Sequence, residues 1–556
     1  MKFGGEYRQA QLDEFYHRHA LGSLTFDGQQ GPWAGDPSIT DTNLFPLADF
    51  MAGYVSPTGS SIAIGDPSRQ VFVNTWDLFA QDTWQIKPKL SFNYGLRYDY
   101  EGPLHNGYQD MSVFRPNLGG IVFQGDQISS LYNPYWGAVS PRLGVAYQAT
   151  TSTVVRTGFG FYYDTPNLNP FLDNRPGNGA PNGVEGNPSG PSPVLTVPPN
   201  NIGAESPIVD GEPVFPSSSA ASCPCALYSI DSGFRPSYNM NYTLQVEQSF
   251  GPRVVAQLGY VGSEARHLLS LLDINQSFPN GESATPGIYS TFIQASVYPD
   301  GPLVGTNPIN QVESIGTSNY NSLQATLRTQ SWHGLSSNIA YTWSHNLDIV
   351  SQYRGTLPQD SHDFKGDYGN SDFDARNTFV GFLSYNIPGS QHLRLLTNGW
   401  QTNTLISLHG GQPFSVFSSS DTTGTNEGTQ RANVVGDPYS GVSHSSSISQ
   451  IWLNQSAFVN PSAYTFGDSR RNQYYGPGYG SWDLSFFKNT PIGERVNTQF
   501  RVEMFNLTNK TNFAPPRNTV GSQLGTLYDT IGDYNGAPGI GAGEPFNTQL
   551  ALKIIF

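Results

Sequence analysis

The polar residues with the most regular spacing lie at alternate positions of long segments that are otherwise rich in apolar side chains. In one segment Arg97 and Asp99 alternate with Leu96, Tyr98 and Tyr100. Side chains two apart on a strand point the same way, so these polar groups would share one face. The same spacing selects a set that we call the polar-face residues: Arg97, Asp99, Gln245, Glu247, Arg328, Asp483, Gln499, Arg501, Glu503, Gln549 and Lys553.

A polar face of this kind has two interpretations. In a sheet closed around a channel it would line the lumen and contact a solute or a plugging domain, whereas in a soluble sandwich it would meet bulk water. We expect structural lining of a lumen rather than a substrate-specific site. Charges enclosed there should pair, and we expect Arg501 to pair with a carboxylate on a neighbouring strand.

Three other groups could bind a metal or form a disulfide, and none has the spacing of a complete site. His17 and His19 would share a strand face without a third ligand. Cys223 and Cys225 could form a strained bridge, and they supply only half of a zinc shell. The acidic stretch 348–374 could offer carboxylate oxygens to calcium, but its spacing is irregular and we expect a solvated loop: Asp348, Asp360, Asp363, Asp367, Asp372 and Asp374.

Catalytic motifs are missing from the sequence as a whole. It contains no nucleophile elbow, no zinc-hydrolase helix and no phosphate-binding glycine loop. We therefore predict no enzyme, no metal site and no cofactor.

The elements that would position the polar-face residues are long strands. The last segment, Phe546 to Phe556, alternates apolar and mostly polar residues over a length that suits a tilted membrane strand of about 9–11 residues better than a soluble strand of about 5–6. The chain as a whole predicts about fifteen strands: 2–8, 21–26, 71–85, 90–100, 141–148, 154–163, 237–250, 253–270, 320–331, 335–345, 375–387, 400–409, 482–488, 495–508 and 546–556.

Composition supports an all-β membrane protein. Only 13% of the 556 residues are charged, about half the usual share of roughly 25%, while aromatics also reach 13%. The net charge of −15, without a basic cluster, excludes a nucleic-acid partner. No apolar run is long enough for a transmembrane helix, and a barrel, with apolar residues only at every second position, needs none.

Turn lengths give the predicted strands an orientation. Short turns alternate with long loops rich in Gly, Pro and Asn, as in outer-membrane barrels, whose short turns face the periplasm. The carboxy-terminus would then be periplasmic, and an odd strand count would start the chain on the outer side. Since bacterial barrels have even strand numbers, and Met1 to Arg8 is not a signal peptide, we expect that an amino-terminal piece is absent.

Several motifs, in a conserved order along nearly the whole chain, resemble a known family. Segments 76–84 and 93–98 resemble the barrel signature of TonB-dependent outer-membrane transporters. Segments typical of the Oar-like subgroup are Ser140-Pro-Arg-Leu-Gly144, Tyr260-Val-Gly-Ser263, Tyr320-Asn-Ser-Leu-Gln324, Tyr341-Thr-Trp-Ser344, Asp372-Phe-Asp-Ala-Arg376, Gly410-Gly-Gln-Pro-Phe414, Arg471-Asn472 with Gly476-Pro477, and Phe500-Arg-Val-Glu-Met-Phe-Asn506. Phe556 resembles the carboxy-terminal signal read by the barrel assembly machinery.

The resemblance implies uptake or export of a bulky solute across the outer membrane of a Gram-negative-type bacterium. Residues 1–556 would be the barrel, part of a 22-stranded barrel in contact with lipid, without the family's plug. The inner-membrane energy-coupling complex would be a partner only if the full-length protein carries a plug. The alternatives are a surface adhesin or receptor without transport, a passive porin and, least in accord with the sequence, a soluble β-rich enzyme.

Overall fold

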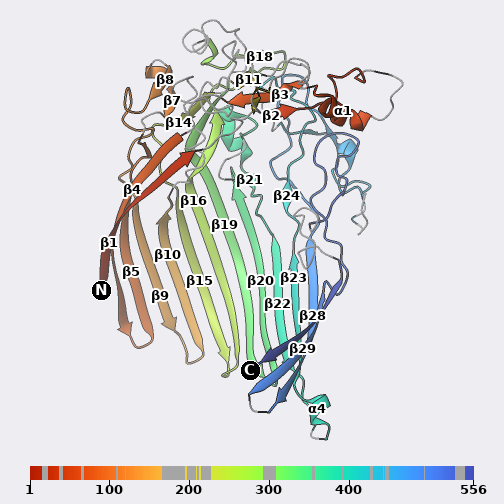
Figure 1. Ribbon diagram of the computed structural model, residues 1–556. Helices are drawn as coiled ribbons and strands as arrows, with labels where there is room; N and C mark the ends of the chain where they lie inside the picture. The colour runs from red at the N-terminus through yellow and green to blue at the C-terminus, as the bar shows by residue number, and fades with distance from the viewer. Residues whose placement is uncertain are drawn as a thin grey trace.

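One large antiparallel sheet dominates the protein, and a layer of folded loops covers one of its edges (Figure 1). The computed structural model describes residues 1–15, 23–34, 36, 42–54, 56–63, 68–107, 111–118, 120–165, 194–196, 208–209, 212–213, 227–291, 308–352, 357–390, 392–425, 430–442, 444, 450–493, 495–531 and 545–556. Within these residues no helix is both long and apolar enough to cross a membrane.

The large sheet holds 17 strands in the described part of the chain, fourteen long and three short. The long strands are β1 (Lys2–Phe15), β4 (Ser68–Lys87), β5 (Leu90–Glu101), β9 (Val139–Gln148), β10 (Thr153–Tyr163), β15 (Tyr238–Phe250), β16 (Val254–Asp273), β19 (Ile309–Trp332), β20 (Leu335–Asp348), β22 (Asn377–Asn386), β23 (Trp400–His409), β28 (Tyr479–Ile492), β29 (Val496–Phe505) and β30 (Asn547–Ile555). The short ones are β6 (His105–Asn106), β14 (Leu227–Ile230) and β21 (Gly369–Asn370).

The remaining elements belong to the loops. The helical ones are η1 (Thr42–Leu44), α1 (Phe45–Ala52), η2 (Pro116–Leu118), η3 (Ser361–Asp367), α4 (Arg394–Thr397) and η4 (Gln455–Ala457). The strands are β2 (Ser23–Thr25), β3 (Ser56–Ala63), β7 (Ser112–Arg115), β8 (Gly120–Phe123), β11 (Val194–Thr196), β12 (Ile208–Val209), β13 (Glu212–Pro213), β17 (Phe278–Pro279), β18 (Ala284–Thr285), β24 (Pro413–Phe414), β25 (Asn433–Val434), β26 (Phe458–Val459) and β27 (Tyr474–Tyr475).

Each long strand pairs antiparallel with the next long strand along the chain, from β1–β4 through to β29–β30. Among the described residues, β1 and β30 each pair along one side only, so the sheet is curved but open (Figure 1). A meander of this kind needs only short connections at one edge, and these span 88–89, 149–152, 251–253, 333–334, 387–399 and 493–495.

The strands predicted from the sequence are confirmed with one exception. Within segment 21–26 the structure describes one strand, β2, which pairs with β3 in a separate three-stranded sheet. This small sheet lies outside the wall, the name we use for the fourteen long strands of the large sheet. The wall therefore has an even number of long strands, and β1 runs from the short-turn side toward the loop layer (Figure 1). The expectation that the chain starts on the outer side was wrong, and the parity argument drawn from it fails.

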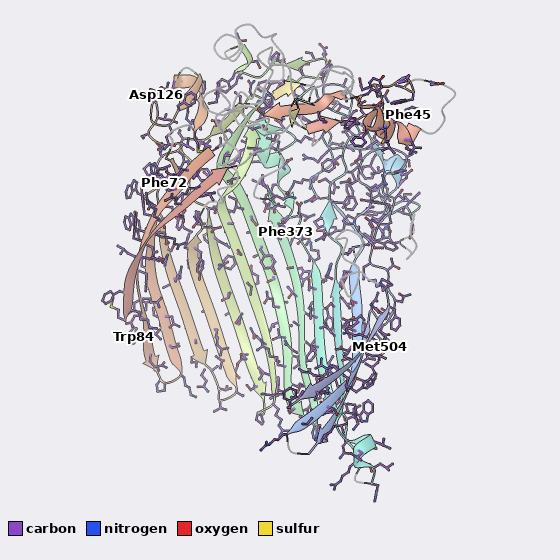
Figure 2. The ribbon with its side chains drawn as sticks, viewed as in Figure 1. Phe45, Phe72, Trp84, Asp126, Phe373 and Met504 are labelled. Carbon is purple, nitrogen blue, oxygen red and sulfur yellow. The ribbon has the colours of Figure 1, made fainter. Side chains whose placement is uncertain are left out.

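Pairing register separates the two faces of the sheet. Residues directly opposite each other in antiparallel strands point to the same face, so the face of one strand can be followed across its neighbours. Leu96 lies opposite Ala80 and Pro141, while Leu552 lies opposite Phe500. This face is apolar and open to the surroundings: Leu96 is 53% exposed and Leu552 68%. Trp84 lies on the same face near the short-turn end of β4 (Figure 2).

Buried loop residues form two hydrophobic cores at the edge of the sheet opposite the short turns. One cluster of buried residues joins the ends of β4, β14 and β19 to β7 and β8: Val71, Val73, Leu104, Met111, Val113, Val122, Leu131, Tyr132, Ile230, Phe234 and Val312. The second lies within 414–524: Phe414, Val416, Ala432, Leu453, Ala457, Phe458, Tyr474 and Leu524. The two hydrophobic cores thus lie in the loop layer rather than against a face of the large sheet.

The register predicts opposite effects for two adjacent residues on β16. Leu258 points to the apolar face and Gln257 to the other. Leu258→Arg should lower the free energy of unfolding in lipid vesicles by about 2–4 kcal/mol, because a cation near the bilayer midplane is costly.

The matched control is Gln257→Arg, which we expect to be tolerated because the side chain faces away from lipid. Equal losses in the two variants, measured by denaturant titration of refolded protein, would contradict the assignment of the faces.

Candidate functional site

The polar-face residues all lie on the face opposite the exposed apolar band. Arg97 is opposite Phe79 and Ser140, and Gln499 is opposite Asn489 and Lys553. Following the pairs from strand to strand brings the other members to the same face: Asp99, Gln245, Glu247, Arg328, Asp483, Arg501, Glu503, Gln549 and Lys553. Six tryptophan and tyrosine residues point the other way, into the apolar band: Trp76, Trp84, Tyr163, Trp343, Trp400 and Trp482. Trp84, Tyr163, Trp400 and Trp482 lie near strand ends, whereas Trp76 and Trp343 lie further inside their strands.

Ion pairs hold several charges in place on this polar face. The Arg97 guanidinium lies 2.6 Å from Asp99 Oδ1 and 3.0 Å from Asp77 Oδ2. Ser140 donates to the other Asp99 oxygen at 3.4 Å. Arg156 and Glu247 form a second pair between neighbouring strands at 3.2 Å. Charges of both signs thus line this side of the wall.

The interaction partners of Arg501 differ from those expected. Its Nε donates to Gln499 Oε1 at 2.6 Å, and its guanidinium lies 4.6 Å from the ring centroid of Phe487. Phe487 is the residue directly opposite Arg501 on β28, so an aromatic ring stands where we expected a carboxylate. The expected pair was therefore wrong: among the described ion pairs, none involves Arg501.

Glycines leave room on the polar face for larger side chains of neighbouring residues. Gly95 and Gly160 both lie opposite Arg142, and Gly144 lies opposite Gly158. Arg142 reaches over the ring of Tyr162, 4.5 Å from its centroid. A cavity of about 820 Å³ is lined in part by these residues. Arg142 and Tyr162 are not among the polar-face residues predicted from the sequence, although both fit the alternation of their strands.

A partly buried polar network, which we call the loop latch, joins the top of β20 to two loops. Its members are Asp348, Ser351, Asn370, Asp372, Asp374, Arg376, Arg471, Asn472 and Tyr475. Arg471 donates to Asp348 Oδ1 at 2.7 Å and to Ser351 Oγ at 2.6 Å. Asn472 Nδ2 donates to Asp372 Oδ1 at 2.6 Å and to the Asn370 carbonyl at 2.8 Å.

The second half of the loop latch centres on Asp374, which is 1% exposed. Its Oδ2 accepts from Arg376 Nε at 2.9 Å and from the Tyr475 hydroxyl at 2.8 Å, while its Oδ1 accepts from the Asn346 backbone N–H at 2.8 Å. A carboxylate this deeply buried is stable only when such donors surround it. The latch therefore fixes the segment after β21 against the loop that carries β27.

The acidic stretch 348–374 is consequently not the solvated loop expected from its composition. Asp348 and Asp374 belong to the loop latch, and Asp367 pairs with Arg431 at 2.6 Å. Asp360 instead accepts from the His362 backbone N–H at the start of η3. Arginines that lie far away in the sequence neutralise Asp348 and Asp367, which local spacing cannot show, whereas Asp374 pairs with Arg376 two residues along. In the sequence, the family-like motifs Asp372–Arg376 and Arg471–Asn472 were the signal that could have pointed to the loop latch.

Other predicted groups stay untested or fall outside the described residues. His17, His19, Cys223 and Cys225 lie outside the described ranges. Within those ranges no three His, Cys, Asp or Glu residues gather to hold a metal. Phe556 follows β30 and is 96% exposed.

The loop latch predicts a large effect for one carboxylate. Asp348→Ala leaves the nearly buried Arg471 guanidinium without its closest anion and should destabilise the loop layer by about 3–5 kcal/mol. Hydrogen exchange at the backbone amides around Asn472 measures this loss.

Asp363, in the same acidic stretch but exposed, provides the control. We expect Asp363→Ala to change the exchange by less than about 0.5 kcal/mol. If both substitutions released the loop equally, acidic content rather than the Arg471 pair would account for the stability.

Two adjacent tyrosines predict opposite effects in the second loop core. Burial raises the pKa of Tyr474 to about 12, and among the described residues its buried hydroxyl has no hydrogen-bond partner. An unfolded tyrosine ionises near pH 10, so stability should fall between about pH 10 and 12 as the unfolded chain loses a proton that the folded chain keeps. Tyr474→Phe should reduce this alkaline loss and be neutral or stabilising at pH 7.

Tyr475→Phe should instead cost about 1–3 kcal/mol at neutral pH, because Asp374 loses one of its donors. Exchange of the loop-core amides, followed against pH in both variants, tests the pair. A neutral Tyr475→Phe together with a destabilising Tyr474→Phe would reverse the expected order.

Comparison with known proteins identifies the family to which the chain belongs. The sequence matches the family described as outer membrane beta barrel domain over residues 1–534. No curated protein matches the chain. Similar solved structures include the outer membrane transporter YddB from Escherichia coli, with 11% identity, a TM-score of 0.49 and coverage of 100% of this chain and 51% of that one.

Two further structures are similar in the same way. A variant of the ferric enterobactin receptor PfeA from Pseudomonas aeruginosa has 14% identity, a TM-score of 0.43 and coverage of 100% and 50%. The iron transporter FrpB from Neisseria meningitidis has 11% identity, a TM-score of 0.42 and coverage of 100% and 52%. The chain spans about half the length of these solved proteins.

The family match extends over most of the chain and agrees with a wall of long antiparallel strands whose exposed band is apolar. The protein therefore belongs to the outer membrane beta barrel domain family and lies in the outer membrane of a Gram-negative-type bacterium.

Proposed function

We propose that the protein is the barrel wall of a TonB-dependent, Oar-like transporter that moves a bulky solute across the outer membrane. The observation that carries this proposal is the two-faced wall: an apolar band on one face, and paired charges such as Arg97 with Asp77 on the other. A porin-sized or larger barrel is too wide for its own side chains to fill, so the polar face would surround an aqueous or plugged lumen.

The polar-face residues would line this lumen. Arg97, Asp99 and Glu247 already form ion pairs within the wall. A solute or a plug would then meet satisfied charges together with groups such as Arg142, which lies over an aromatic ring. This arrangement favours the passage of a polar solute over its permanent capture, and the loop layer above would select the solute.

A complete transporter of this type would also need further strands, a plug and their partner proteins. In the part of the chain that the structure describes, β1 and β30 each pair along one side only, and further strands of a 22-stranded barrel would pair with their other edges. Residues 1–556 would be the carboxy-terminal barrel portion. In the full-length protein a plug would connect it to the inner-membrane energy-coupling complex, and the barrel assembly machinery would read Phe556.

One observation favours a second candidate, an adhesin or receptor without transport. The loop layer has two hydrophobic cores of its own and the loop latch, so it is built as a firm outer surface. Phe373, between the latch residues Asp372 and Asp374, is 68% exposed (Figure 2). A surface of this kind could bind a partner without passing it on.

A comparison of three strains separates these functions: wild type, a strain lacking the gene for the full-length protein, and a strain with its TonB energy-coupling protein inactivated. Under the transport proposal, the same compound changes its distribution between cells and medium in both mutant strains. Under the adhesin alternative, only the gene deletion has a phenotype, which is loss of surface binding with no change in solutes. The second outcome would overturn transport.

A further inference from the structure

One connection at the short-turn edge is longer than the others and has a fold of its own. It spans 387–399 between β22 and β23, contains α4 and projects below the sheet (Figure 1). The Ser390 backbone N–H donates to Thr397 Oγ1 at 3.0 Å, and this hydroxyl donates to the Leu393 carbonyl at 2.9 Å. Gly399, with a φ of 76°, returns the chain to the wall. These bonds hold the turn in one shape.

Two side chains of the apolar face donate hydrogen bonds to this turn. Trp400 and Lys488 lie opposite each other on β23 and β28, on the face that bears the apolar band. Trp400 Nε1 donates to the Leu396 carbonyl at 2.6 Å, and Lys488 Nζ donates to the Asn398 carbonyl. Lys488 Nζ also lies 5.8 Å from the Trp400 ring centroid. The turn is therefore attached to the lipid-facing side of the wall rather than to the polar face.

The turn presents leucines to its surroundings. Leu393 is 60% exposed, Leu395 77% and Leu396 69%. On the apolar face of the wall, Ile492 near the end of β28 and Ile554 near the end of β30 are each 56% exposed. The exposed leucines thus continue the apolar band past the end of the strands, although in water such a cluster would be unfavourable.

The charge of the turn is positive. Across 387–400 the ionisable residues are His392 and Arg394, with no acidic residue, and Lys488 lies beside Trp400. Tryptophan and basic residues are typical of the level of lipid headgroups, where an aromatic ring and a cation with a long apolar stem both find suitable surroundings. The phosphates of a lipid leaflet complement this charge.

We propose that 392–397 is an interfacial anchor, whose Leu395 and Leu396 insert into the periplasmic leaflet while His392 and Arg394 meet its phosphates. The short-turn edge of an outer-membrane barrel faces the periplasm, which assigns the leaflet. Amphipathic helical segments that combine leucines with basic residues bind at membrane interfaces in this way. The anchor would fix the depth of the wall in the bilayer at β22 and β23.

Fluorescence quenching in nanodiscs tests the anchor. A cysteine at Leu395→Cys, in a chain with Cys223→Ser and Cys225→Ser, carries an environment-sensitive dye, and phosphatidylcholine with a nitroxide near the top of its acyl chain supplies the quencher. Lys89→Cys, exposed in the short turn at 88–89, is the matched control. We expect blue-shifted emission and several-fold stronger quenching at position 395 than at position 89.

Equal and weak quenching at both positions would overturn the proposal, and it would leave a periplasmic protein as the partner of the leucines. A label at Leu393→Cys repeats the test if the first variant does not fold. Addition of phosphatidylglycerol to the nanodiscs should increase quenching at position 395, and His392→Gln with Arg394→Gln should abolish the increase. No response to the anionic lipid would overturn the role of the two basic residues.

Discussion

The absence of hydrogen-bond partners inside a bilayer is the constraint on which this structure depends. Every backbone N–H and C=O within the hydrocarbon layer must be satisfied by the protein, so a wall of strands must pair along its whole length. The antiparallel pairing from β1 to β30 meets this requirement, because every long strand between the two edges pairs on both sides. Once the strands are paired, alternation decides the rest: one face meets lipid, and the other can be as polar as its function requires.

The two polar systems of the protein follow from the same constraint at different depths. On the wall, Arg97 lies between Asp77 and Asp99, whose carboxylates balance its charge on the polar face. In the loop layer, Arg471 and Arg376 hold carboxylates that would otherwise repel one another. The wall therefore offers a lined surface, whereas the loop latch makes the covering layer firm. Under the proposed transport function, the first would serve passage and the second selection of the solute.

Alternation made most of the wall predictable. Segments 90–100, 400–409 and 154–163 coincide almost residue for residue with β5, β23 and β10, because the period of two is a local property. The face shared by the polar-face residues could be predicted for the same reason. Segment 21–26 has the same local pattern and yet lies outside the wall, since nothing local says which sheet a short strand joins.

Contacts between distant residues could not be predicted. Arg471 meets Asp348 across more than a hundred residues, and Asp367 meets Arg431, so the acidic stretch had to be interpreted without its partners. Likewise Phe487 stands opposite Arg501 only because of the exact β28–β29 register. The resemblance of Asp372–Arg376 and Arg471–Asn472 to family motifs marked these residues, although it did not say that they touch.

The assignment of the two faces to lipid and to an enclosed polar space can be tested most directly along β5. Nitroxide labels placed one at a time from Leu90 to Tyr100, in the protein reconstituted in nanodiscs, report collision with oxygen in lipid and with a water-soluble nickel complex. Oxygen accessibility should peak at Phe92, Tyr94, Leu96 and Tyr98, and nickel accessibility at Asn93, Gly95 and Arg97. Profiles without this period of two, or with the two sets exchanged, would contradict the account.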